Sequence, residues 1–164
     1  MERRNRVYQE TGARGVRWSL DGLREEYGAM SRSNPVLGSR LTKVLEWAVA
    51  QGLFMEASTQ TTRPAFLLSG PMGERVVSFY SDGAIYCRFG QAAPKLFAGG
   101  VDDRNRFVSE LKQLNLIDAS VNPDAVVWGR QLNRRLDELN DKELNDLLAV
   151  FAGSLKSRGR NDGC

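Results

Sequence analysis

The 164-residue sequence contains no histidine. This absence excludes Ser-His-Asp and Cys-His nucleophile systems, metal sites that need two histidines, and histidine proton shuttles. Only two cysteines are present, Cys87 and Cys164, which is too few for a disulfide framework or a structural zinc site. Neither a G-x-x-x-x-G-K-[ST] loop nor a G-x-G-x-x-G turn occurs. We therefore expect no cofactor, no metal and no enzyme, with an enzyme built on carboxylates or lysine left open.

Long apolar runs are also missing. No run of about 18 apolar residues occurs, so we expect no membrane span. The polar, arginine-rich beginning of the chain lacks the apolar core of a signal peptide, and we expect a cytoplasmic protein. With 41% hydrophobic and 26% charged residues, the composition is ordinary for a globular protein. We expect one domain over residues 16–156, between a flexible lead-in (1–15) and a flexible tail (157–164).

Apolar residues three and four positions apart predict helices over much of this domain. The clearest runs from Asn34, a candidate N-cap, to Gly52, a C-terminal glycine. A second has a capping box, with Asn140 followed by Glu143, and an apolar stripe of five residues behind it. Other helices are expected after Ser19, after Asp102 as N-cap and, ambiguously, within Trp128 to Leu139.

Between these helices the apolar period changes to that of strands. Pro64 to Ser69, Arg75 to Ser81 and Ala84 to Gly90 are short strand-like runs, and Asp82-Gly83 is a strong hairpin signal. We expect an α+β fold in which a small three-stranded antiparallel meander packs with about four to five helices. If Asp82 and Gly83 are the two central turn residues, Tyr80 pairs with Ile85. Phe79, Tyr86 and Arg88 then share one face of the hairpin.

A formal charge of +3 and a pI near 9.1 permit a nucleic-acid partner. Aromatic rings are platforms on which bases stack, so Phe79 and Tyr86 are the candidate stacking residues. Arginine matches phosphate geometry, and six arginines are the candidate nucleic-acid contacts. The alternative is that helices cover the two rings and that the neighbouring Asp102, Asp103, Asp137 and Glu138 pair with the arginines. The six candidates are Arg88, Arg104, Arg106, Arg130, Arg134 and Arg135.

The order of several segments resembles a known family. The helix segment LEWA (Leu45 to Ala48) precedes GLFMEAS and the aromatic hairpin VVSFYSDGAIYCRFG (Val76 to Gly90). LKQLNLI and LNDLLAVF follow, the latter ending at Phe151. Over residues 37–152 the chain resembles a C-terminal accessory domain of unknown function, found in some bacterial restriction and nuclease-associated proteins. The resemblance implies an accessory or recognition role rather than catalysis.

Three hypotheses about function follow. The first is a non-catalytic binding or accessory module that contacts nucleic acid or a nuclease partner, in a bacterial defence or mobile-element setting. It expects the six arginines to converge. The alternative is a protein–protein interaction or regulatory domain that acts through a homo-oligomer, which expects a large uncovered apolar patch. The third, a carboxylate enzyme, expects acidic side chains that meet in a cleft.

Overall fold

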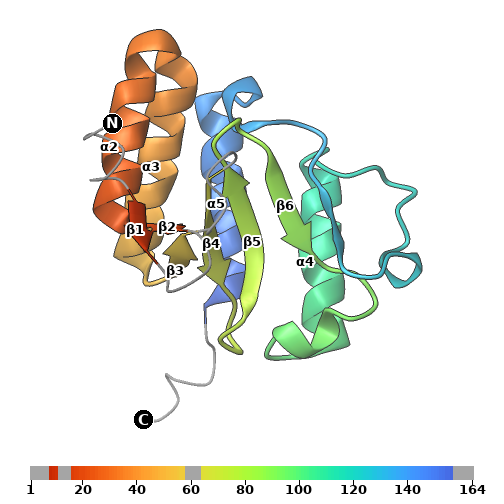
Figure 1. Ribbon diagram of the computed structural model, residues 1–164. Helices are drawn as coiled ribbons and strands as arrows, with labels where there is room; N and C mark the ends of the chain where they lie inside the picture. The colour runs from red at the N-terminus through yellow and green to blue at the C-terminus, as the bar shows by residue number, and fades with distance from the viewer. Residues whose placement is uncertain (1–7, 11–15, 58–63, 157–164) are drawn as a thin grey trace.

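The computed structural model describes residues 8–10, 16–57 and 64–156, with side chains from Ser19 onward. The described residues form four α-helices, three short 3-10 helices, a two-stranded ribbon and a five-stranded antiparallel sheet of order β3-β4-β5-β6-β7 (Figure 1). The elements are β1 (Tyr8–Glu10), β2 (Val16–Trp18), α2 (Leu20–Ser33), α3 (Pro35–Gln51), β3 (Phe54–Ala57), β4 (Ala65–Ser69), β5 (Arg75–Tyr80), β6 (Ile85–Arg88), η1 (Pro94–Leu96), α4 (Val101–Gln113), η2 (Pro123–Ala125), β7 (Gly129–Gln131), η3 (Leu136–Glu138) and α5 (Asp141–Leu155).

The α+β class agrees with the sequence prediction, but the predicted three-stranded sheet is wrong. Two further strands, β3 and β7, flank the expected meander, so the sheet has five strands. Both are short: β3 has four residues, and β7 has three residues with exposed side chains at Arg130 and Gln131. Neither carries the apolar alternation that marks a strand in sequence. Strand β1 lies within the predicted lead-in; residues 1–7, 11–15 and the predicted tail lie outside the described residues.

Local capping signals define the helix ends. The Asn34 side chain accepts a hydrogen bond from Leu37 N, Pro35 opens α3, and Gly52 ends it with φ of 74°, which glycine adopts without strain. Asn140 and Glu143 form the predicted capping box of α5. Helix α4 differs from expectation, because it begins at Val101 with Gly100 as its N-cap. The predicted cap, Asp102, instead lies in the first turn, where a negative charge suits the helix dipole.

The hairpin between β5 and β6 has a three-residue loop, and this corrects the predicted register. Gly83 N donates to Tyr80 O, and Tyr80 N donates to Ala84 O, so Tyr80 lies opposite Ala84 rather than Ile85. The Asp82 side chain accepts from Ala84 N, and Gly83 has φ of 94°. The loop is therefore one residue longer than the two-residue turn that Asp-Gly predicts. Because successive side chains alternate between faces, the shift moves every residue of β6 to the opposite face relative to β5.

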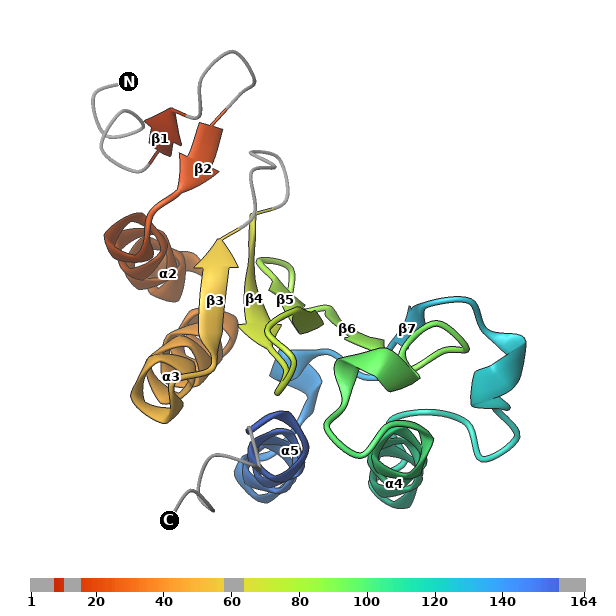
Figure 2. The same ribbon diagram turned by 90° about the horizontal axis from the view of Figure 1, so that it is seen from below.

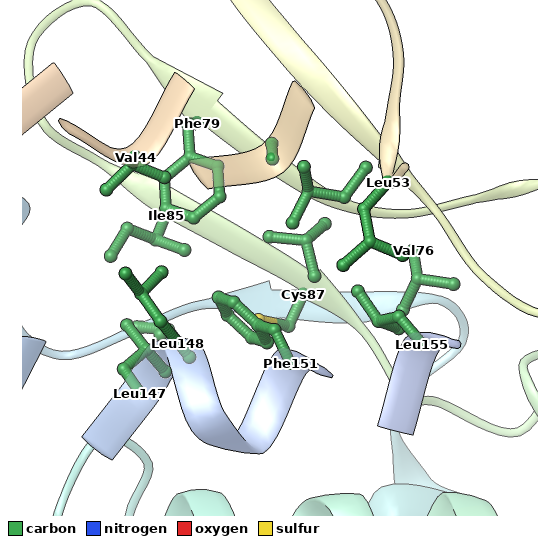
Figure 3. Packing of buried hydrophobic residues seen from close by; sticks show 14 of the residues in the cluster. Val44, Leu53, Val76, Phe79, Ile85, Cys87, Leu147, Leu148, Phe151 and Leu155 are labelled. Carbon is green, nitrogen blue, oxygen red and sulfur yellow. The ribbon is translucent and has the colours of Figure 1, made fainter. Parts of the chain in front are cut away.

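One face of the sheet packs against helices. Phe79 pairs with Phe66 and with Ile85, and all three are fully buried. The Phe79 ring stacks on Phe66 at 5.1 Å between centroids and meets Phe151 of α5 edge-on at 5.9 Å. Figure 3 shows the α5 side chains of Leu147, Leu148, Phe151 and Leu155 against Val76, Phe79, Ile85 and Cys87 of the sheet. Helices α3, α5 and α4 all lie on this side (Figure 2).

The opposite face carries no helix in the described part of the chain (Figure 2). Strand register places one residue from each strand in a row across it: Glu56, Leu67, Ser78, Tyr86 and Gln131. Tyr86 is half-buried and Gln131 is exposed. Arg88 lies two residues beyond Tyr86 on β6, so its side chain is on the same helix-free face.

Candidate functional site

The two predicted stacking residues do not form a platform. Phe79 is fully buried between Phe66 and Phe151, whereas Tyr86 lies half-buried on the helix-free face. The prediction that Phe79 shares a face with Tyr86 and Arg88 is therefore wrong. The three-residue hairpin loop is the physical reason, because it places Phe79 on one face of the sheet and Tyr86 and Arg88 on the other.

Four of the six candidate arginines are engaged with carboxylates. Arg106 pairs with Asp103 at 3.0 Å and Arg135 with Asp137 at 3.8 Å, as the alternative interpretation expected. Arg134 makes a two-pronged contact with Glu143 at 2.7 and 3.0 Å, which holds η3 against the start of α5. These side chains serve the fold, and the six arginines do not converge on one surface.

The fourth, Arg104, is inside the protein with 1% of its surface exposed. Its Nη1 donates to the carbonyl oxygens of Phe89 (3.0 Å) and Gly90 (2.8 Å), and its Nη2 donates to Asp124 Oδ1 (2.7 Å). A buried guanidinium requires such partners, because a charge without them is costly to remove from water. Arg104 thus joins α4 to the end of β6 and to η2, and it is a structural residue rather than a phosphate contact.

Arg88 and Arg130 have no carboxylate within ion-pair distance among the described residues, but they lie apart. Arg130 pairs with Cys87 across β6 and β7, and the Cys87 side chain is fully buried in the core. The register therefore places Arg130 on the face opposite Arg88. Of the six candidates, only Arg88 contributes to the cationic surface that the structure forms.

That surface is centred on Trp128. The Arg88 guanidinium carbon lies 4.7 Å from the centre of the Trp128 ring, and Lys95 Nζ lies 6.0 Å from it. Both distances are in the range of cation–π attraction. Trp128 nevertheless keeps 40% of its surface exposed, and the adjacent Val127 is 59% exposed.

Arg75 adds a third positive charge. At the β4–β5 bulge, Leu68 pairs with Val77 while Ser69 pairs with Arg75, so Val76 is the extra residue. Val76 packs into the core (Figure 3), and the strand beyond it is shifted by one position. Burial lowers the pKa of the Arg88 guanidinium below its ordinary value, and the positive charge of Arg75 lowers it further. Arg88 stays protonated, as arginine does in proteins, so the two cations repel each other.

We call Arg75, Arg88, Lys95 and Trp128 the Trp128 surface. Its three cations have no carboxylate within ion-pair distance in residues 19–57 and 64–156, in contrast to the paired arginines described above. Glu74 is the acidic residue that acts on Arg88, through its charge and without an ion pair. The Trp128 surface is therefore a locally positive region beside an exposed aromatic ring.

The backbone around Trp128 is held closely to the end of β6. Trp128 O accepts hydrogen bonds from Phe89 N (2.9 Å) and Gly90 N (2.7 Å). A Cβ at Gly129 would overlap the carbonyl oxygen of Cys87, so glycine is required for this approach. Arg104 donates hydrogen bonds to the carbonyl oxygens of the same two residues, Phe89 and Gly90. It also binds Asp124, which lies four residues before Trp128. We call residues 124–128 the Trp128 strap.

Sequence reasoning missed Arg75, Lys95 and Trp128. Trp128 begins the segment, Trp128 to Leu139, for which the sequence predicts a helix only ambiguously, and its neighbours give no signal for an exposed ring. Arg75 and Lys95 lie beside turns and far apart in the chain, and only the fold brings Arg75 near Arg88 and Lys95 near Trp128.

The uncovered apolar patch that the homo-oligomer hypothesis expects does not occur among the described residues. The α5 stripe of five apolar residues is buried against the sheet rather than exposed. Large exposed apolar side chains in the described residues are scattered, apart from the neighbours Val127 and Trp128. No group of three or more acidic or cysteine side chains that could hold a metal ion occurs in the part of the chain that the structure describes. None of the helices described is long and apolar enough to cross a membrane.

Comparisons of the chain with protein-family models, with curated proteins and with solved structures give no match. The resemblance to an accessory domain of restriction and nuclease-associated proteins therefore stays a prediction, and the function is argued from the Trp128 surface alone.

Proposed function

We propose that this protein is a non-catalytic module that binds nucleic acid through the Trp128 surface. The observation that carries the proposal is the combination of three cations that have no ion pair within the described part of the chain with the exposed aromatic ring of Trp128. Positive charges that lack counter-charges attract a polyanion, and most of the affinity of nucleic-acid binding proteins comes from phosphate contacts. Aromatic rings next to arginine and lysine are the usual means by which proteins hold nucleic-acid strands.

The repulsion between Arg75 and Arg88 supports this choice. Burial lowers the Arg88 pKa and the positive charge of Arg75 lowers it further, whereas the charge of Glu74 acts in the opposite direction. The two arginine charges therefore repel each other in the free protein. A phosphate bound between them would remove this repulsion and would gain two charge-assisted contacts. Several other exposed arginines have acidic neighbours, as at Arg106 and Arg135, and the unpaired Arg130 lies on the opposite face of the sheet. A region where several cations gather without such ion pairs is the best candidate for a binding surface.

The test is fluorescence-anisotropy binding of labelled DNA and RNA oligonucleotides across a salt series, with single-charge variants. Arg75→Gln, Arg88→Gln and Lys95→Gln should each weaken binding. Each should also reduce the dependence of log affinity on log salt by about 0.7 to 0.9, the contribution of one phosphate contact. The matched control is Arg32→Gln, which removes one exposed positive charge from the last turn of α2, in a helix that lies at the other end of the sheet (Figure 1).

Two results would contradict the proposal. One is no binding of any oligonucleotide at low salt. The other is an equal loss of affinity in the Arg32 and Arg88 variants, because the effect would then come from net charge rather than from this surface. If nothing binds, size measurements for a homo-oligomer become the next experiment.

A further inference from the structure

The Trp128 surface contains more than charge, and its ring bears on which form of nucleic acid it would bind. Trp128 is the single aromatic residue among the exposed large apolar side chains that the structure describes. The ring systems of Phe66, Phe79, Phe89, Phe107 and Phe151 are all fully buried. Burial of an aromatic ring stabilises a protein, and the exposed Trp128 ring forgoes part of this stabilisation, unlike these buried phenylalanines. An exposed ring flanked by cations is therefore a feature to be explained by a ligand.

The position of Trp128 is fixed before any ligand arrives. Its carbonyl oxygen accepts two backbone hydrogen bonds from the end of β6, and the next backbone contacts are Gln91 N to Val126 O (2.7 Å) and Ala92 N to Val127 O (3.1 Å). Arg104, buried beneath, holds both Asp124 of the strap and the β6 end to which the strap is bonded. Arg88 adds a cation–π contact to the ring itself. A ring held in this way loses little conformational entropy when a partner stacks on it.

We propose that the Trp128 surface prefers single-stranded nucleic acid, with one unpaired base stacked on Trp128 and the neighbouring phosphates bound by Arg75, Arg88 and Lys95. This inference rests on the proposed function and goes beyond it, because phosphate contacts alone do not distinguish a strand from a duplex. Bases within a duplex are stacked on each other and present only their edges. A single strand exposes base faces, and these can stack on an aromatic side chain whatever the sequence.

The experiment compares three ligands of equal length and equal salt: a single-stranded oligodeoxynucleotide, the same strand in a duplex, and a strand in which abasic sites replace the central nucleosides. The abasic strand keeps the phosphates and lacks the base faces. We expect the single strand to bind more tightly than the other two and to quench tryptophan fluorescence. The abasic strand should bind more weakly and give little quenching.

Two variants of Trp128 sharpen the test. Trp128→Leu removes the ring, keeps an apolar side chain, and should weaken single-strand binding by about 5- to 150-fold, the equivalent of one stacked base. Trp128→Phe keeps a smaller ring and should lose less. Neither variant should change the salt dependence, because neither removes a phosphate contact. Neither should change the affinity for the abasic strand. Thermal unfolding of both variants serves as the folding control.

The outcomes separate the two proposals. Equal affinity of the three ligands, with no effect of Trp128→Leu but a loss in Arg88→Gln, would overturn base stacking and leave phosphate binding standing. Tighter binding of duplex than of single strand would also overturn this inference. Absence of binding by all three ligands at low salt would overturn both proposals together. Because the ligand comparison uses the unaltered protein, it gives a result even if a variant does not fold.

Discussion

Replacing Arg104 by methionine tests how the fold holds the Trp128 strap. Methionine keeps much of the length and the apolar stem of arginine but removes every donor. Arg104 donates four hydrogen bonds: two to the carbonyl oxygens of Phe89 and Gly90, one to Asp124, and one from Nε to Asn105 at 2.8 Å. The side chain is 1% exposed, so water cannot easily replace the lost donors at the two carbonyls.

The expected cost can be estimated contact by contact. Each buried carbonyl that loses its partner costs about 1–3 kcal/mol. The carboxylate of Asp124 is 70% exposed and returns to water, so its ion pair contributes less than about 1 kcal/mol. Asn105 is also exposed and adds little. Removal of a buried charge offsets part of the loss. Together these contributions give a destabilisation of about 3 kcal/mol, and Asp124→Asn should cost less than about 1 kcal/mol.

Urea unfolding followed by circular dichroism measures both variants. A loss of about 3 kcal/mol corresponds to a fall in melting temperature of about 6–12 °C for a domain of this size. Arg104→Met should also weaken oligonucleotide binding, because the strap that carries Trp128 loses its anchor. A cost within about 0.5 kcal/mol for Arg104→Met would refute the structural role of Arg104. So would equal costs for Arg104→Met and Asp124→Asn, since the two carbonyls would then contribute nothing.

Three further predictions follow from the described contacts. Gly129→Ala should destabilise the protein strongly in thermal unfolding, because the new Cβ would overlap Cys87 O. Gly153→Ala on α5, where there is open space around the glycine, should instead stabilise the protein by about 0.5–1 kcal/mol. Equal effects of the two substitutions would contradict this prediction. The Arg134 hydrogen bond lowers the pKa of Glu143 in the folded protein. The difference in unfolding free energy between the protein and its Glu143→Gln variant should therefore be full above the ordinary glutamate pKa of about 4.3 and should shrink as pH falls through the lower folded pKa. A difference that does not change with pH would argue against this contact. Burial raises the pKa of the Cys87 thiol, so little reactive thiolate forms at neutral pH. In a Cys164→Ser variant, iodoacetamide at neutral pH should therefore label Cys87 only when the protein unfolds. Rapid labelling of the folded protein would show that the thiol is accessible.

The helix boundaries were predictable because their signals are local. Asn34 and Pro35 at the start of α3, Gly52 at its end, and the Asn140–Glu143 capping box each act through hydrogen bonds or dihedral preferences within about four residues. Sequence contains this information directly. The same reasoning failed at α4, where Gly100, with a positive φ of 66°, is the N-cap and the helix begins at Val101, one residue before the predicted cap Asp102.

The strand count was not predictable, because β3 and β7 are held by partners rather than by their own sequences. The β7 strand, Gly129–Gln131, has little to bury and forms because β6 offers its free edge and because Gly129 permits a close approach to Cys87 O. The candidate site failed for a related reason. Whether an arginine is free or paired depends on tertiary neighbours: Arg134 finds Glu143 nine residues away, and Arg104 finds Asp124 twenty residues away. Sequence spacing alone does not reveal such pairs.

The hairpin loop links the fold to the candidate site. With a two-residue turn, Phe79 and Arg88 would share a face, and the sheet would have to bury a cation with its largest aromatic cluster or expose that cluster to water. The three-residue loop, closed by the hydrogen bond from Ala84 N to Asp82 Oδ1, removes this conflict. It directs Phe79, Ile85 and Cys87 to the helices and leaves Arg88 on the helix-free face. The bulge at Val76 makes the same kind of change on β5, because it buries a valine and leaves Arg75 to act on Arg88. Two one-residue irregularities, each fixed by core packing, thus place two like charges together at the surface, where binding of a phosphate would relieve their repulsion.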